Sequence, residues 1–368
     1  MSEWRAWHVH HEDPDRLILE CVHPVLARVE PLVERRFWER HYAGGTHLRI
    51  RLRGAGEALA RAGAEVEAAL RAWVAANPSA DRPGYSERRV AALLEREGLP
   101  VEAEDLAYRN NVVLPRTCRT HPGVYVSPEA AELAEDFRHE AMGLAVRIIG
   151  GARPRREEML RLFFFHALEA TGSLEDGCVS FKSHWEGLSA AAPPPVAERI
   201  RASYQANRET VGALLTGVLR AWEDGRGAKD PVLVEWRSLV GRYHRRTLAL
   251  LAAGKQVTPQ PATLEEARAL REQASAAVRE QSTFVRTLWA DERFLASIQF
   301  EPAFLGPRVL VNLLYVLVHS VGLVPVDKMM LCHHAHAAVE DHTGRSLDAL
   351  LARNVSRIVE AHAHRWAE

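Results

Sequence analysis

The residues most able to do chemistry lie in an alternating stretch near the N-terminus, residues 46–53. Successive side chains of an extended strand point to opposite faces, so one face here is basic and the other apolar. The basic face carries His47, Arg49, Arg51 and Arg53, and the apolar face carries Leu48, Ile50 and Leu52. Guanidinium groups bind carboxylates, phosphates or peptide carbonyls. The stretch predicts a strand that is anchored to a core and binds a ligand; the alternative is an edge strand whose charges block aggregation.

A second cluster, residues 177–186, combines hydroxyl groups, an ammonium, an imidazole and an indole within one short stretch. Its candidates for a site are Ser180, Lys182, His184 and Trp185. Such a mixture can bind a polar substrate and move protons. The alternative is the polar start of a helix with Trp185 in the core.

Two further clusters contain titratable side chains. Tyr125 precedes a predicted helix start, where its phenol could meet a substrate or anchor a loop. His333, His334 and His336 lie at adjacent and one-turn spacings, so they cannot all reach one ion from a single helix. We therefore predict no metal there. A proton relay involving these histidines or His319 fits better, because imidazole titrates near neutral pH.

Composition narrows the classes of partner and compartment. The 368 residues carry Lys+Arg 47 and Asp+Glu 48, a net charge of -1, which argues against nucleic acid as the main partner. The four cysteines are scattered without paired spacing, as in a reducing cytosol. The first residues lack the pattern of a signal peptide, and polar residues and a proline interrupt the most apolar segment, residues 309–326. These features predict a cytoplasmic protein with no membrane partner.

Common catalytic signatures are absent from the sequence. It has no nucleophile elbow, phosphate loop, dinucleotide fingerprint or His-Glu-x-x-His motif. Gly150-Gly151 follows a predicted helix, so it is expected to end that helix rather than bind phosphate. No cofactor is predicted.

The elements that must position these residues indicate an α+β fold. Strands are expected at residues 4–10, 33–42, 46–53 and 105–114, and Gly44-Gly45 is expected to join the second and third in a hairpin. Helices are expected at residues 15–27, 57–76, 128–149, 155–170, 196–223, 231–251, 264–291, 308–321, 326–342 and 347–366. We predict one domain over residues 1–368, with an antiparallel or mixed sheet mainly within 1–126. A largely helical part, 127–368, covers and extends it.

Several of these stretches resemble a known family. Trp4-Arg5-Ala6-Trp7-His8-Val9-His10, Phe37-Trp38-Glu39-Arg40-His41-Tyr42 and Gly44-Gly45-Thr46-His47-Leu48-Arg49-Ile50-Arg51 resemble the start of the lantibiotic dehydratase C-terminal domain. Ser180-Phe181-Lys182-Ser183-His184, Asn312-Leu313-Leu314-Tyr315, Gly322-Leu323-Val324-Pro325 and Leu331-Cys332-His333 resemble stand-alone relatives from thiopeptide antibiotic pathways. The resemblance spans most of the chain and is strongest near its start.

The resemblance implies one of two activities. One is elimination of glutamate from glutamylated serine or threonine. The other is pyridine synthesis, a formal [4+2] cycloaddition of two dehydroalanines with loss of water and the leader peptide to give a macrocycle. The length of the chain favours the second activity. The absence of two motifs also favours it. Eliminating members contain Arg-Tyr-Gly-Gly and His-Met-x-x-Asn-Arg-Leu. At the matching places this chain has Val126-Ser127-Pro128-Glu129 and His333-His334-Ala335-His336-Ala337.

On this basis we predict a thiopeptide pyridine synthase that needs no metal or cofactor. The predicted catalytic residues are Arg49, Arg51, Tyr125, His184 and His319, and the predicted substrate-binding residues are His47, Arg53, Lys182, Ser180, Trp185 and Tyr315. The expected partner is a leader-bearing precursor peptide with thiazoles and dehydroalanines, and the chain could form a homodimer. The alternatives are a glutamate-eliminating domain and a non-catalytic leader-binding partner.

Overall fold

The computed structural model describes residues 2–96, 106–117, 125–225, 227, 229–259, 261, 263–273 and 282–361. The chain divides into two compact units. The sheet unit comprises Met1–Val124, Ala134–Gly151 and His319–Gly322, and the helical unit comprises Tyr125–Leu133, Ala152–Val318 and Leu323–Glu368. The α+β class predicted from the sequence is confirmed.

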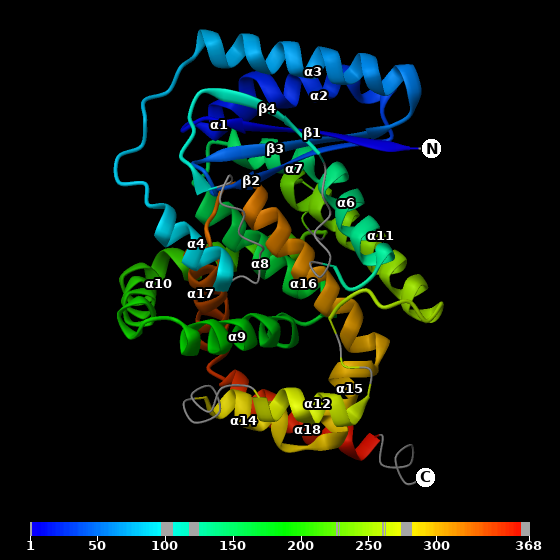
Figure 1. Cartoon of the computed structure of the whole chain (residues 1–368). Helices are drawn as coiled ribbons and strands as arrows, with labels where there is room; N and C mark the ends of the chain where they lie inside the picture. The colour runs from blue at the N-terminus through cyan, green and yellow to red at the C-terminus, as the bar shows by residue number, and fades with distance from the viewer. Residues whose placement is uncertain are drawn as a thin grey trace. The chain divides into compact units, whose positions relative to one another are not determined.

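The sheet unit is built on four antiparallel strands in the order β2-β3-β1-β4 (Figure 1). Their bounds are β1 (Glu3–His10), β2 (Arg35–His41), β3 (His47–Gly54) and β4 (Val112–Arg116). Its helical segments are α1 (Pro14–Leu17), the π-helix η1 (Ile18–Val22), α2 (His23–Val29), the 3-10 turn η2 (Glu30–Leu32), α3 (Gly56–Ala76), α4 (Glu87–Arg96), most of α6 (Pro128–Glu140) and α7 (Met142–Ile149). The first three expected strands are therefore confirmed.

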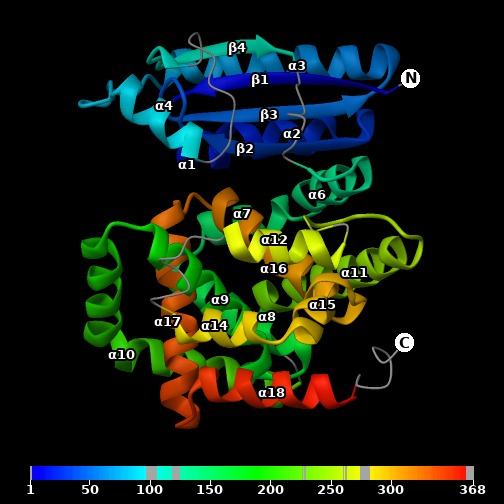
Figure 2. The same ribbon diagram turned by 60° about the horizontal axis from the view of Figure 1, so that its bottom comes forward.

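The alternation of β3 decides how the sheet is buried. Leu48, Ile50 and Leu52 are fully buried, whereas the arginines between them keep partial exposure. Helix α3 contacts β1, β3 and β4 and lies beside the sheet in Figure 2. Its residues Leu59, Val66 and Leu70 recur on one helical face and are buried. The apolar face of β3 thus belongs to the core of this unit.

The turn between β2 and β3 depends on glycine. Gly44 and Gly45 have φ values of 72° and 101°, which disfavour residues with a Cβ atom. A Cβ on Gly45 would also lie 2.7 Å from the carbonyl oxygen of Arg109. The predicted hairpin is confirmed, and its register pairs His41 with His47.

The helical unit contains the remaining elements. They are α8 (Arg155–Thr171), α9 (Leu174–Ala191), α10 (Pro194–Glu223), α11 (Pro231–Ala252), α12 (Leu264–Gln273), α14 (Thr283–Ala290), α15 (Glu292–Phe300), α16 (Pro302–Ser320), α17 (Pro325–Thr343) and α18 (Leu347–Ala361). Helix α8 contacts α9, α10, α11 and α17 and is central to this unit. A Cβ on Gly177 of α9 would lie 2.4 Å from the Cα of Ala167 in α8, so glycine permits this close approach of the two helices.

Several predicted elements are wrong in their extent. The helix expected at 128–149 is divided at Ala141 into α6 and α7. The expected helix at 264–291 is not continuous, because Ser282 has an extended backbone and its hydroxyl accepts a hydrogen bond from the Val285 amide to begin α14. The expected strand at 105–114 begins later, at Val112, and includes Pro115. Proline is tolerated there because, among the described residues, β4 lies at the edge of the sheet and pairs with β1 alone.

One helix among the described residues, α16, is long and apolar enough to cross a membrane. Half of its apolar window is buried inside the protein, as in a core helix. Leu310, Leu314 and Leu317 place its buried face within the helical unit. This apolar character accounts for the hydropathy of residues 309–326.

Candidate functional site

The arginine row of β3 is compensated by carboxylates from neighbouring elements. Arg51 forms an ion pair with Glu39 of β2 at 3.1 Å, and Arg138 of α6 reaches the other oxygen of Glu39 at the same distance. Burial alone would raise the pKa of Glu39, but Arg138 and Arg51 hold it below its ordinary value. Arg53 approaches Glu34 at 3.7 Å and packs over the Trp4 ring. Sequence alternation predicted the shared face but not these carboxylates.

His319 lies in the same part of the sheet unit. Its Nε2 donates to the carbonyl oxygen of Arg40 at 2.9 Å, which leaves Nδ1 as the possible acceptor. Burial lowers the pKa of His319, and the nearby Glu39 opposes that effect. The structure therefore brings two predicted catalytic residues, Arg51 and His319, around one carboxylate.

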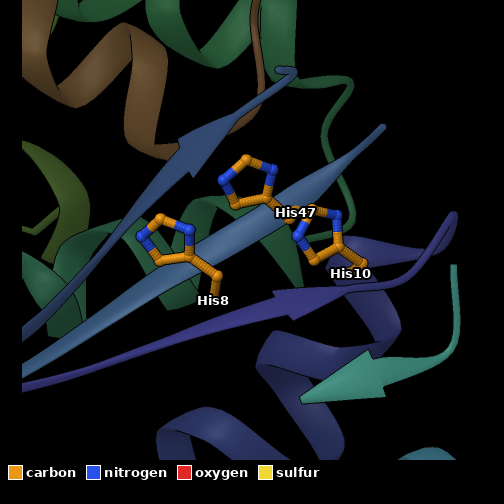
Figure 3. Close-up of side chains that lie close together, drawn as sticks. All are labelled: His8, His10 and His47. Carbon is orange, nitrogen blue, oxygen red and sulfur yellow. The ribbon is translucent and has the colours of Figure 1, made fainter. Parts of the chain in front are cut away.

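Figure 3 shows a histidine cluster on β1 and β3 formed by His8, His10 and His47. The His47 ring lies 5.0 Å from that of His8 and 4.4 Å from that of His10, measured between centroids. Its Nδ1 donates to the Gly45 carbonyl, and the Arg49 guanidinium donates to its Nε2. Burial, assisted by nearby arginines, lowers the pKa of His8 to about 3 and that of His10 to about 4. These imidazoles are neutral at pH 7.

Among the described residues, this histidine cluster is the group whose side chains lie close enough together to coordinate one metal ion. Its ligand atoms lie within 4.8 Å of one another, so the three imidazoles could bind an ion by distance alone. A cation there would be repelled by Arg49 and Arg116, the charges that also lower the pKa of His8. The cluster is better suited to accept hydrogen bonds from guanidinium groups. His8 and His10 were missed as site residues because strand pairing, and not sequence proximity, brings them to His47.

The helical unit contains a cavity of about 340 Å³, here called the α9 cavity. Its lining comes from the end of α8, from the first part of α9 and from α14, α15, α16 and α18. Ser180, Ser183 and His184 provide polar groups from α9, and Phe294 and Phe304 provide aromatic walls. Two predicted site residues, Ser180 and His184, are thus brought to one cavity.

His184 places an imidazole in the lining of the α9 cavity. Its Nδ1 donates to the Ser180 carbonyl at 3.0 Å, which fixes the tautomer and leaves Nε2 as an acceptor. Burial lowers the pKa of His184, although the bond to Ser180 opposes this effect, so the imidazole is neutral at pH 7. The ring of Tyr315 packs edge-on against it at 4.7 Å between centroids. A neutral imidazole at a cavity wall can accept a substrate proton.

Tyr315 supports His184 from the core. Its hydroxyl shares a hydrogen bond with the Cys332 thiol at 3.4 Å, and burial raises its pKa well above the ordinary value. The Lys328 ammonium lies 5.0 Å from the centre of the ring. These contacts hold the ring in place, and Tyr315 touches the cavity lining through His184.

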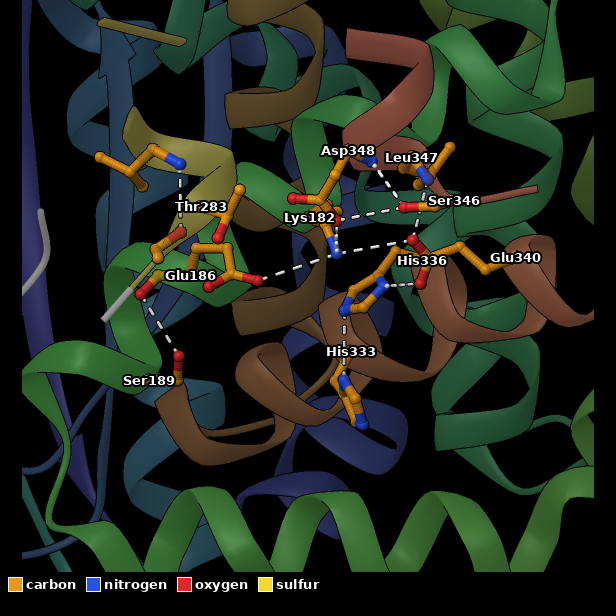
Figure 4. Close-up of polar contacts among 12 residues, drawn as sticks. Lys182, Glu186, Ser189, Thr283, His333, His336, Glu340, Ser346, Leu347 and Asp348 are labelled. Atoms are coloured by element: carbon orange, nitrogen blue, oxygen red, sulfur yellow. Dashed lines mark hydrogen bonds and ion pairs between the residues drawn. The ribbon is translucent and has the colours of Figure 1, made fainter. Parts of the chain in front are cut away.

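Lys182 connects three helices (Figure 4). Its ammonium lies 3.0 Å from Asp348, 3.5 Å from Glu340 and 3.8 Å from Glu186. Burial alone would lower the pKa of Lys182, but Glu340 and Asp348 outweigh it and raise the pKa. The charge is therefore already compensated within the protein by α9, α17 and α18. This arrangement is that of an internal clamp.

The histidines of α17 join this clamp through hydrogen bonds. His333 is bonded to His336 at 3.1 Å, and His336 is bonded to Glu340 at 3.4 Å. The Trp185 ring packs at a tilt against the His333 ring, with 4.4 Å between centroids, and is buried. These hydrogen bonds form a chain from His333 through His336 to the carboxylate of Glu340.

Tyr125 is the first residue of the helical unit and lies three residues before the start of α6. Ser127 caps that helix, since its hydroxyl accepts from the Ala130 amide at 3.0 Å and donates to the Gln256 carbonyl at 2.6 Å. The helix start predicted at Ser127 and Pro128 is confirmed. Tyr125 is partly buried and lies outside the lining of the α9 cavity.

Comparisons with solved structures give matches along nearly the whole chain. A pyridine synthase, TbtD, from thiomuracin biosynthesis has a TM-score of 0.69 and 22% identity, over 93% of this chain and 99% of that one. TsrL has a TM-score of 0.68 and 17% identity, over 96% of this chain and 98% of that one. The tRNA-dependent lantibiotic dehydratase MibB from Microbispora sp. 107891 has a TM-score of 0.50 and 16% identity, over 93% of this chain and 28% of that one.

These structural likenesses establish the fold. A comparison with curated proteins gives no significant match. The profile of the family described as lantibiotic biosynthesis dehydratase C-term matches residues 4–339. The match includes strands β1 and β3, residues 177–186 of α9 and most of α17, and these segments carry the resemblance described above. This chain belongs to the lantibiotic biosynthesis dehydratase C-terminal family.

Proposed function

We propose that this protein is a pyridine synthase of thiopeptide biosynthesis that acts on an azole-containing precursor peptide. The observation that carries the proposal is the correspondence of 93% of this chain with 99% of TbtD at a TM-score of 0.69. MibB matches the same share of this chain, but the match covers only 28% of MibB. In extent, this chain therefore corresponds to the pyridine synthase, whereas the matching region of MibB is one part of a longer protein.

The reaction needs a proton to move before two bonds can form. The amide that precedes one dehydroalanine must become its iminol tautomer, whose C=N and adjacent C=C bonds form the azadiene. In the proposed scheme, Nε2 of His184 accepts the amide N–H proton and returns a proton to the amide oxygen. The second dehydroalanine then supplies the two carbons that complete the ring. Water and then the leader peptide leave to give the pyridine.

Proximity is the largest expected contribution to the rate. Holding two ends of one peptide in reacting geometry can lower a barrier by about 7–11 kcal/mol. Flat azole rings fit between aromatic side chains, and Phe294 and Phe304 provide such walls in the α9 cavity. The cavity therefore combines a base with surfaces that can orient a modified peptide.

The sheet unit is proposed to hold the peptide and assist at carbonyl oxygens. Arg49, Arg51 and Arg53 present donors along β3, and acidic leader residues are suitable ligands for such a row. Arg51 must exchange its contact with Glu39 for one with substrate. His47, Tyr125 and His319 remain candidates for orienting the peptide or supplying a proton. The enzyme is proposed to be cytoplasmic, to use no metal or cofactor, and to be active as a monomer or a homodimer.

The decisive experiment is incubation of the purified protein with a precursor that contains dehydroalanines and thiazoles. Loss of the leader together with a new pyridine chromophore would support the proposal. Glutamate loss from a glutamylated peptide would instead support the elimination activity, and binding without either reaction would support a leader-binding partner. Mass spectrometry distinguishes the two reactions, and a binding titration with the unreacted peptide detects the third outcome.

A substitution of His184 tests where the chemistry occurs. His184→Phe should lower turnover by about 100-fold or more, because general acid–base catalysis contributes about 10²–10⁴ in rate. The matched control is His342→Phe, since His342 is exposed near the end of α17. Equal rates for the two variants would remove His184 from the catalytic scheme.

A further inference from the structure

The α9 cavity contains a cation that the scheme above does not use. Arg308 of α16 lines the cavity beside His184, whose pKa its charge helps to lower. Its two terminal nitrogens donate to the side-chain oxygen of Gln299 at 3.1 Å and to the carbonyl of Ile298 at 2.7 Å. Both acceptors are formally neutral. Within the part of the chain that the structure describes, no carboxylate is paired with Arg308.

The end of α15 compensates this charge only in part. Ile298 and Gln299 lie in the last turn of α15, and the C-terminus of a helix carries about half a negative charge. Roughly half of the positive charge of Arg308 therefore remains without a counter-charge. A guanidinium has five N–H donors, so about three stay available beyond the two bonds described. Burial lowers the pKa of Arg308, and no acidic group among the described residues opposes that shift.

The remaining lining limits what can neutralise this charge. Phe294 and Phe304 give the cavity aromatic surface, which favours a planar group over a hydrated phosphate. Asp176 also lines the cavity and accepts a hydrogen bond from Asn354 at 2.9 Å. An anion would be repelled from Asp176 and attracted to Arg308. Within this lining, Arg308 of α16 is therefore the group that attracts an anion.

We propose that the α9 cavity binds a planar heteroaromatic group that carries a carboxylate, with Arg308 as its counter-ion. Paired guanidinium N–H groups match the two oxygens of a carboxylate. The identity of the ligand rests on the proposed function: in an azole-containing precursor, the group is the carboxyl-terminal end of the modified peptide. A free heteroaromatic acid has the same chemistry and is the alternative source.

The first test uses 2-methylthiazole-4-carboxylate and its primary amide as probes in calorimetric titrations of the full chain. The acid should bind at least tenfold more tightly than the amide. Arg308→Met should abolish this preference, whereas Arg308→Lys should keep part of it. The matched control is Arg293→Met, because Arg293 is exposed on α15 and lies outside the cavity lining.

Two results would overturn the binding site. One is equal affinity for the acid and the amide, and the other is an unchanged preference in Arg308→Met. Arg308 also bonds to the end of α15, so thermal unfolding must show that each variant is folded. Phe304→Leu gives a second variant, which should weaken both probes without removing the preference for the acid.

The second test separates the two sources of the carboxylate. An azole-containing peptide with a free carboxyl terminus should bind at least tenfold more tightly than the same peptide ending in an amide. Equal affinity of the two peptides, with the small acid still bound, would overturn the assignment to the peptide terminus and identify a free acid. These measurements need no turnover, so a failure to form pyridine would refute the proposed function without deciding this one.

Discussion

Removal of the Lys182 ammonium should destabilise the helical unit strongly. In Lys182→Met, the carboxylates of Glu186, Glu340 and Asp348 lose their shared cation, and the Lys182 side chain is only 8% exposed. Breaking a buried ion pair on one side costs about 3–5 kcal/mol, because the remaining charge stays uncompensated. The carboxylates are 21–32% exposed, so we expect a value near the lower end. For a unit of this size, about 3 kcal/mol lowers Tm by roughly 6–12 °C.

The assay is thermal unfolding followed by circular dichroism at pH 7. Lys255→Met is the matched control, because Lys255 pairs with Glu129 at 2.7 Å but is 48% exposed. An exposed pair contributes at most about 1 kcal/mol, so this variant should lose no more than a few degrees. Equal shifts in Tm for the two variants would refute the argument that burial makes Lys182 a clamp.

The same argument gives a pH dependence. Burial alone would raise the pKa of Glu340, but hydrogen bonds from His336 and the Leu347 amide, together with Lys182, lower it to about 2. A lowered carboxyl pKa gives stability that is complete above the unfolded pKa and is lost as pH falls through the folded one. The difference in Tm between wild type and Lys182→Met should therefore shrink between about pH 5 and pH 2. A constant difference over this range would contradict the assignment.

Three further predictions concern packing, thiol reactivity and protonation. Gly177→Ala should lower the free energy of unfolding by about 1–3 kcal/mol, because the added methyl group would overlap α8. Gly187→Ala should raise it by about 0.5–1 kcal/mol, because a methyl group there meets open space. Thermal unfolding of both variants checks this pair. Burial raises the pKa of the Cys332 thiol to about 12 and raises that of the Cys178 thiol further. Both thiols should therefore resist alkylation by iodoacetamide in the folded protein. Rapid labelling, measured by mass spectrometry, would contradict this prediction. Since the pKa of His10 is about 4, its NMR signals should not titrate between about pH 8 and pH 5.5; a midpoint near pH 6 would show that its imidazole is not buried as described.

The local sequence pattern was sufficient to predict those elements whose signals lie within a few neighbouring residues. The β3 strand followed from strict alternation, and its hairpin followed from Gly44-Gly45, because both depend on backbone geometry at neighbouring positions. The start of α6 followed from Ser127 and Pro128 for the same reason. By contrast, helical periodicity continued through Ser282, and only the extended backbone of that residue shows where α14 begins.

The sequence determined which types of residue are available for the site, and the tertiary structure determined how they are arranged. The sequence identified Arg51, Lys182 and His184 as chemically capable, but each has partners that come from distant segments. Strand pairing supplies Glu39 to Arg51, and helix packing gathers carboxylates around Lys182. The α9 cavity likewise unites α9 with α14, α15, α16 and α18, and Arg308 joins it there. Charge compensation and burial depend on which segments pack together. Only the fold therefore shows that Lys182 is paired inside the protein whereas Arg308 lines a cavity.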